Sequence, residues 1–142
     1  MLHSKVSKRY ARALLQWAGE KEKAIARSAL REVEAIARRE KNLDKFGKST
    51  LSQAAVILDF GVQAQPVLLM NLKDKRKDWK VRFWVADILG YVGDEGSAGA
   101  LWNMEKNLRE RKEVRQRARL ALRAIEKREK LTASRRSSRP SQ

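Results

Sequence analysis

The chain of 142 residues contains no cysteine, one histidine and only two prolines. Without cysteine it cannot build a disulfide framework, a thiolate zinc site or a catalytic thiol. It also has only seven glycines, and it is rich in Ala, Leu, Arg, Lys and Glu, which are good helix formers. This composition is typical of a helical protein.

Long apolar runs are also lacking. Uninterrupted apolar runs such as Val67–Met70 fall far short of the roughly 18 residues that a membrane span needs. Basic residues interrupt the N-terminal segment, where a signal peptide would need an apolar stretch. We therefore expect a cytoplasmic protein that has no membrane partner.

Acidic residues are scarce. There are 17 of them against 33 Lys and Arg, which gives a formal net charge of +16. The excess lies at the ends, because residues 1–48 carry +7, residues 49–104 carry zero and residues 105–142 carry +9. This distribution predicts a partner with an acidic or polyanionic surface and says nothing about the fold.

The spacing of apolar residues predicts an all-α chain, because they recur every three or four positions. Helices are expected over residues 4–41, 66–72, 79–91, 98–108 and 112–130. The first of these has an alternative as two helices with a bend at Gly19. Residues 41–48 are expected to form a loop, and residues 50–60 a helix, with a strand as the alternative.

We expect one domain over residues 1–130, with N-terminal helices in 1–48 and repeats in 49–130. Residues 131–142 lack an apolar period and predict a disordered basic tail.

An internal repeat lies within the second half. Val81-Arg82 recurs as Val114-Arg115, an offset of 33 residues, and Leu89 matches Leu122 at the same offset. Repeated helix pairs of this length predict a short α-solenoid of antiparallel helix pairs.

The motif around this repeat reads Leu89-Gly90-Tyr91-Val92-Gly93-Asp94, then Ala98-Gly99-Ala100-Leu101, then Glu113-Val114-Arg115. Over about residues 61–125 it resembles the HEAT-like repeat family, in particular the short repeats first named from phycobilisome lyases. The resemblance implies a short α-solenoid with an N-terminal helical cap. Members of that family include adaptors, chromophore-lyase subunits, a metal hydroxylase and DNA glycosylase relatives, so the motif implies an architecture rather than an activity.

Catalytic and metal-binding residues are not evident. The one histidine, His3, lies near the terminus, and the repeated His-Glu pairs of the hydroxylase branch are absent. We therefore expect no catalytic residue, no metal, no cofactor and no enzymatic activity. Asp87, three residues after Trp84, resembles the aromatic-plus-Asp layout of HEAT-like glycosylases, but a surface Asp beside a core Trp is the favoured interpretation.

A basic stripe is the candidate partner-binding site. Arg115, Arg119 and Arg123 are spaced i, i+4 and i+8, which puts them on one helix face, and Arg111 and Lys127 extend the stripe at either end. The guanidinium fork suits both carboxylate and phosphate. A merely solvated face is the alternative.

Three further features have two interpretations each. Trp84 and Trp102 are either packing residues, which we favour, or stacking platforms for a ligand or base. The resemblance implies that Arg82, like Arg115, pairs with an acidic residue of a neighbouring turn, with Asp78 and Asp94 as candidates, and direct contact with a ligand is the alternative.

These observations predict a non-catalytic interaction or scaffold protein that binds a partner with an acidic surface. A nucleic-acid-binding protein that uses its basic terminal helices is the alternative, and a glycosylase relative is less favoured.

Overall fold

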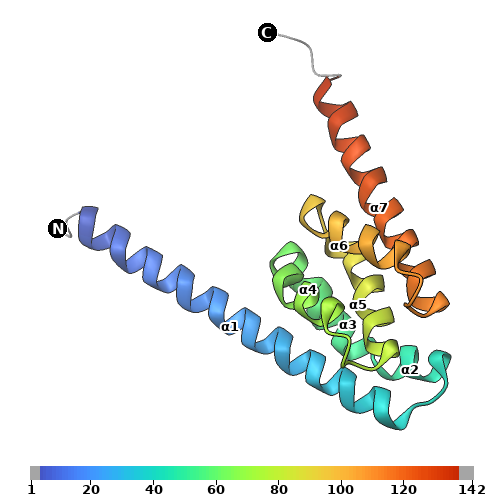
Figure 1. Cartoon of the computed structure of the whole chain (residues 1–142). Helices are drawn as coiled ribbons and strands as arrows, with labels where there is room; N and C mark the ends of the chain where they lie inside the picture. Colours follow the sequence, from blue (N-terminus) through green and yellow to red (C-terminus); the bar gives the residue numbers. More distant parts are fainter. Residues whose placement is uncertain (1–3, 138–142) are drawn as a thin grey trace.

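The computed structural model describes residues 4–137, without the side chains of residues 4–7, 15, 16, 18, 136 and 137. Over this range the chain is helical and contains no strand, so the predicted all-α class is confirmed. The elements are α1 (Ser4–Arg39), α2 (Leu43–Ser49), α3 (Leu51–Phe60), the 3₁₀ helix η1 (Gly61–Ala64), α4 (Gln65–Lys73), α5 (Trp79–Val92), α6 (Glu95–Lys106) and α7 (Lys112–Ser137) (Figure 1).

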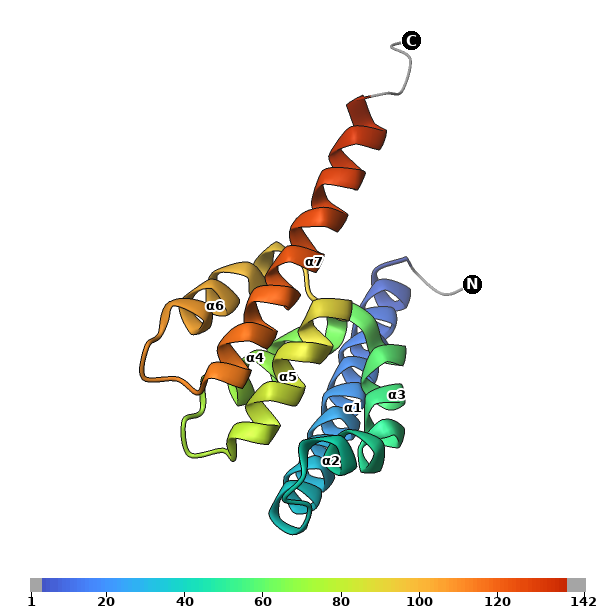
Figure 2. The same cartoon turned by 90° about the vertical axis from the view of Figure 1, so that its right-hand side faces the viewer.

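Helix α1 runs through Gly19 as one helix of 36 residues, so the alternative of two helices is wrong. Only its second half is packed, through buried side chains that begin at Ala26 and continue with Leu30 and Val33. The first half projects beyond the rest of the protein, as does the last part of α7 (Figures 1 and 2). The two ends that carry the excess charge are therefore the two projecting helices.

Helix α2 lies where we expected a loop, and that prediction was wrong. The side-chain oxygen of Asn42 accepts hydrogen bonds from the backbone N–H groups of Asp44 (2.9 Å) and Lys45 (3.1 Å), which caps the helix. Phe46 is buried in the core and holds the short helix in place. Together these two interactions outweigh the polar composition of the segment.

The segment from α3 to α4 is helical, so the strand alternative for residues 50–60 is wrong. Gly61 has a φ of 61°, which suits glycine and separates α3 from η1. By length and composition alone, Leu51–Lys73 is apolar enough to cross a membrane, although it contains no long uninterrupted apolar run. Core helices pass the same test, and Ile57, Leu68 and Leu72 of this segment lie in the core.

Helices α5 and α7 form the most extensive packing between elements, and α6 packs on α7 beside them (Figure 2). The approach is close at Gly90, where an added Cβ would lie 3.1 Å from the Cα of Ala121. Val81 and Val85 of α5 and Val114 and Ala118 of α7 are fully buried, as their spacing predicted. The glycine of the Leu-Gly motif thus allows the two helices to pack closely.

Two predictions about the helix ends were wrong. The helix expected over residues 98–108 ends at Lys106, so Leu108 follows α6 and is 82% exposed. Residues 131–137, expected to be disordered, continue α7, and residues 138–142 of that predicted tail lie outside the described range. The extension has a physical basis, because no proline interrupts residues 112–137 and the packed part of α7 provides a nucleus for further turns.

The Gly90 contact leads to a stability prediction. Gly90→Val would force its side chain against the backbone of α7, so we expect a loss of about 1–3 kcal/mol in the free energy of unfolding, measured by urea denaturation. Gly99→Val is the matched control, because Gly99 also lies inside a helix but an added Cβ there meets nothing within 4 Å. Equal losses in both variants would show that helix propensity, and not the α5–α7 contact, explains the effect.

Candidate basic interface

The first half of the predicted stripe faces the end of α6. Arg115 Nε donates a hydrogen bond of 3.2 Å to the backbone carbonyl of Glu105, and Arg119 Nε lies 3.8 Å from Glu105 Oε1. Arg123 and Lys127 are exposed further along α7 and form no ion pair within residues 4–137. Among the described residues, the positive charge of the stripe is thus partly balanced by Glu105 at the Arg115–Arg119 end and is not balanced at the Arg123–Lys127 end.

A shallow pocket of about 260 Å³ lies between α6 and α7 at the start of this stripe. Its lining residues come from both helices and comprise Glu105, Lys106, Lys112, Arg115, Gln116 and Arg119. Four cations therefore surround a hollow that contains one carboxylate. We name these four cations, Lys106, Lys112, Arg115 and Arg119, the basic pocket.

Sequence reasoning missed two members of the basic pocket. Lys112 lies three residues before Arg115, so helical spacing could have revealed it. Lys106 comes from α6, and its place beside the stripe depends on how α6 packs against α7, which no local pattern reports.

Arg111, expected to extend the stripe, turns toward α5. The central carbon of its guanidinium lies 4.0 Å from the centroid of the Trp79 ring, and its Nε donates a hydrogen bond of 2.6 Å to Glu113 Oε2. This hydrogen bond lowers the pKa of the Glu113 carboxyl below its usual value. Arg111 is therefore engaged within the chain, unlike Arg123 and Lys127.

The two arginines that flank the stripe hold α7 against α5. Arg117 Nη1 lies 3.2 Å from Asp87 Oδ1. Arg128 donates to the carbonyl oxygens of Gly90 (2.5 Å) and Gly93 (2.8 Å) at the end of α5. The carbonyls at a helix end lack intrahelical partners, so Arg128 satisfies groups that would otherwise remain unpaired.

Arg82 pairs with an acidic residue of a neighbouring connection, but neither Asp78 nor Asp94 is that residue. Its guanidinium forms a largely buried ion pair with Glu110, which lies between α6 and α7. Asp78 instead caps α5 and pairs with Lys80 at 3.1 Å.

Asp94 has a different role at the turn before α6. Its carboxylate accepts hydrogen bonds from the side-chain amide of Gln65 (3.0 Å) and from the backbone N–H of Gly96 (2.8 Å). The Gln65 hydrogen bond is the larger cause, and together the two bonds hold the pKa of Asp94 below its usual value. Asp94 therefore links the start of α4 to the start of α6 and does not bind an arginine.

The two candidate stacking residues differ in exposure. Trp84 is 5% exposed and lies in the core, which fits the packing interpretation, whereas Trp102 is 52% exposed on α6. The carboxylate of Asp87 pairs with Arg117, which fits the interpretation of a surface Asp beside a core Trp. A stacking role thus has a structural basis only at Trp102.

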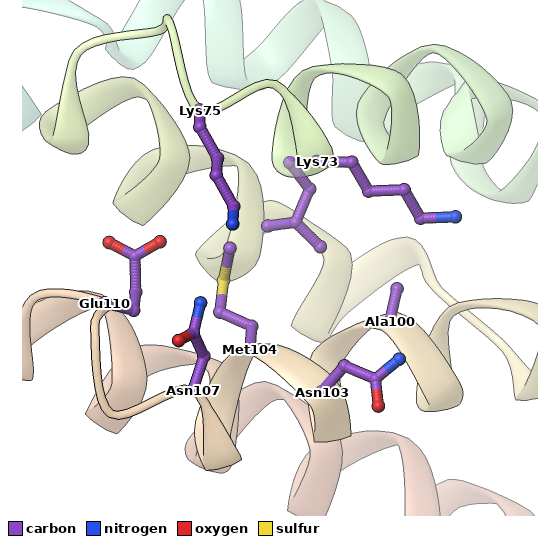
Figure 3. A pocket seen from close by; sticks show the side chains of 8 residues that line it. Lys73, Lys75, Ala100, Asn103, Met104, Asn107 and Glu110 are labelled. Atoms are coloured by element: carbon purple, nitrogen blue, oxygen red, sulfur yellow. The ribbon is translucent and has the colours of Figure 1, made fainter.

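A second shallow pocket, of about 240 Å³, lies between the end of α4 and α6 (Figure 3). Leu72, Ala100 and Met104 supply apolar lining, and Lys75 points toward Met104 from the opposite side of the pocket. It uses other residues of α6 than the basic pocket does.

No group of three or more acidic or histidine side chains in the described part of the chain lies close enough together to hold a metal ion. His3 lies outside that part. Comparisons with protein-family models, with curated proteins and with solved structures give no match.

Substitutions in the buried ion pair of Arg82 and Glu110 test whether this pair stabilises the fold. Arg82→Met leaves the Glu110 carboxylate buried without its partner, so we expect a loss of about 3–5 kcal/mol in unfolding free energy by urea denaturation. The double variant Arg82→Met/Glu110→Leu removes both charges and should recover most of that loss. A loss below about 1 kcal/mol in the single variant would contradict a structural role.

Proposed function

We propose that this protein is a non-catalytic helical-repeat scaffold that binds a partner with an acidic surface through the basic pocket and the adjacent Arg123 and Lys127. The observation that carries the proposal is the convergence of four cations from α6 and α7 on one hollow that holds a single carboxylate. An acidic side chain of a partner could enter this hollow and form bidentate contacts with a guanidinium.

The repeat architecture is part of the same proposal. The two helices that open with Val-Arg, α5 and α7, pack against each other, as stacked HEAT-like units would. The close contact at Gly90 gives the Leu-Gly motif a packing role in this arrangement. On this interpretation, α1 and α2 form the N-terminal cap, and the repeats begin with α3.

The lack of aromatic side chains in the lining of the basic pocket favours a protein partner over a nucleic acid. Aromatic side chains that could stack on bases do not line the basic pocket, and the exposed Trp102 is not among its lining residues. Binding to phosphates alone would depend steeply on salt and would tolerate any sequence. The nucleic-acid alternative therefore becomes an outcome of the binding test.

The test is a titration of fluorescein-labelled polyglutamate and of a labelled DNA duplex with the full chain, read by fluorescence anisotropy. We expect Arg115→Ala/Arg119→Ala/Arg123→Ala to weaken polyglutamate binding by about tenfold or more, because each exposed charge pair contributes roughly 0.2–1 kcal/mol. The wild-type chain should bind the duplex more weakly than polyglutamate at moderate salt.

The matched control is Lys41→Ala/Lys45→Ala/Lys48→Ala, which removes the same charge from exposed positions at and around α2. Equal weakening in both triple variants would refute the assignment to α7, since only net charge would then matter. Tighter binding to the duplex, with a slope in log salt that falls in the α7 variant, would establish the nucleic-acid alternative instead.

A further inference from the structure

The first half of α1 carries an apolar stripe that nothing in the described chain covers. Tyr10, Leu14 and Trp17 are spaced i, i+4 and i+7 and are 68%, 47% and 63% exposed. Figures 1 and 2 show this part of α1 projecting from the packed helices. We name residues 8–21 the α1 arm.

The stripe on the α1 arm is not a continuation of the packed face of α1. At about 100° per residue, Tyr10 lies about 160° round the helix from Ala26, the first residue of the buried stripe. The buried stripe faces α3 and α5, so the exposed stripe faces away from them. A further helix pair stacked on the packed face would leave it uncovered.

The α1 arm is mainly basic. Its Lys8, Arg9 and Arg12 are exposed, and its one acidic residue, Glu20, lies near the end of the arm, 3.7 Å from Lys23 Nζ. The same helical geometry places Lys8 and Arg12 on the face opposite Tyr10, with Arg9 at the boundary. Lys21 Nζ lies 5.2 Å from the centroid of the Trp17 ring, at the other end of the stripe.

The separation of the basic face from the apolar stripe, together with the small size of the stripe, argues against two kinds of partner for the α1 arm. A single-stranded nucleic acid needs aromatic and basic side chains in one groove, whereas here most of the basic side chains lie across the helix from the aromatic ones. A second copy of the chain would meet the stripe with its own Tyr10, Leu14 and Trp17. Three side chains on each copy would bury well below the roughly 800 Å² per partner of a stable interface.

An anionic lipid surface fits the same separation. An interfacial helix buries an apolar face that contains Trp and Leu at the boundary between headgroups and acyl chains, while Lys and Arg side chains reach the phosphates. Tyr and Trp are favoured at this depth, because each has an apolar body and a polar tip. A helix that lies along a surface does not need the long apolar run that a membrane span requires.

We propose that the α1 arm binds the surface of an anionic bilayer, with Tyr10, Leu14 and Trp17 inserted and with Lys8, Arg9 and Arg12 at the lipid phosphates. This departs from the expectation of no membrane partner, which considered spanning segments only. The proposal does not rest on the α7 interface, since it uses the opposite end of the chain.

The test is sedimentation of the full chain with large unilamellar vesicles, made of phosphatidylcholine alone or of phosphatidylcholine and phosphatidylglycerol at a ratio of about 3:1. We expect binding to the anionic vesicles, weak binding to the neutral ones and release at high salt. Tyr10→Gln/Leu14→Gln should weaken binding to the anionic vesicles at least about tenfold, because two inserted apolar side chains are lost.

The matched control is Tyr91→Gln/Leu108→Gln, which changes the same residue types at exposed positions away from the arm and should bind like the wild type. Circular dichroism would verify that both variants keep the wild-type helix content. The proposal is overturned by absence of binding to the anionic vesicles at low salt, by equal binding to neutral vesicles, or by equal binding of the arm variant and the wild type.

Two further outcomes also overturn it and separate it from the proposed function. If Arg115→Ala/Arg119→Ala/Arg123→Ala abolishes vesicle binding while the arm variant retains it, the α7 interface binds the lipid and the arm does not. If the chain ignores vesicles but forms a dimer that the arm variant loses in analytical ultracentrifugation, a second copy covers the stripe.

Discussion

The close packing of α5 against α7 is the constraint on which the rest of the structure depends. The absence of a side chain at Gly90 brings the backbone of α5 to Ala121, and fully buried valines from both helices pack around that contact. Polar interactions then hold this pair in register, because Arg117 and Arg128 reach from α7 to α5 and Arg82 reaches from α5 to Glu110. Arg82, Arg117 and Arg128 therefore form contacts within the α5–α7 pair. These three arginines are thus less available to a partner.

The projecting helices have the opposite character. The α1 arm has no described tertiary partner for its apolar stripe, and α7 continues beyond its last buried residue, Ile125. An isolated helix in water is marginal, so these ends are helical because they extend helices that are nucleated in the core. Both ends are basic, and an anionic surface that covers either one would stabilise it. Of the two proposed interfaces, only the α1 arm lies on such a projecting end, because the basic pocket lies on α6 and on the packed part of α7.

The sequence was informative wherever one local pattern decides the structure. The three-and-four spacing located most helices and the buried face of α7, and Pro66 marked the start of α4 as expected. The sequence was less informative where a single side chain, or a residue from a distant part of the chain, determines the local structure. Asn42 and Phe46 produce α2 within a polar segment, and the basic pocket needs Lys106 from another helix. The helix predicted over residues 4–41 contains Tyr10, Leu14 and Trp17, but spacing alone could not reveal that these side chains face away from the core, because this depends on which face of α1 the other helices cover.

The central claim is that a packed core carries two basic helical ends that are available to partners. Hydrogen–deuterium exchange of the free chain tests it most directly, since opening free energies follow tertiary packing. We expect slow exchange of the backbone amides over residues 81–90 and 114–125. Over residues 8–20 and 126–137 we expect exchange that is faster by orders of magnitude. Protection of residues 8–20 equal to that of the core helices, in a chain shown to be monomeric, would contradict the central claim.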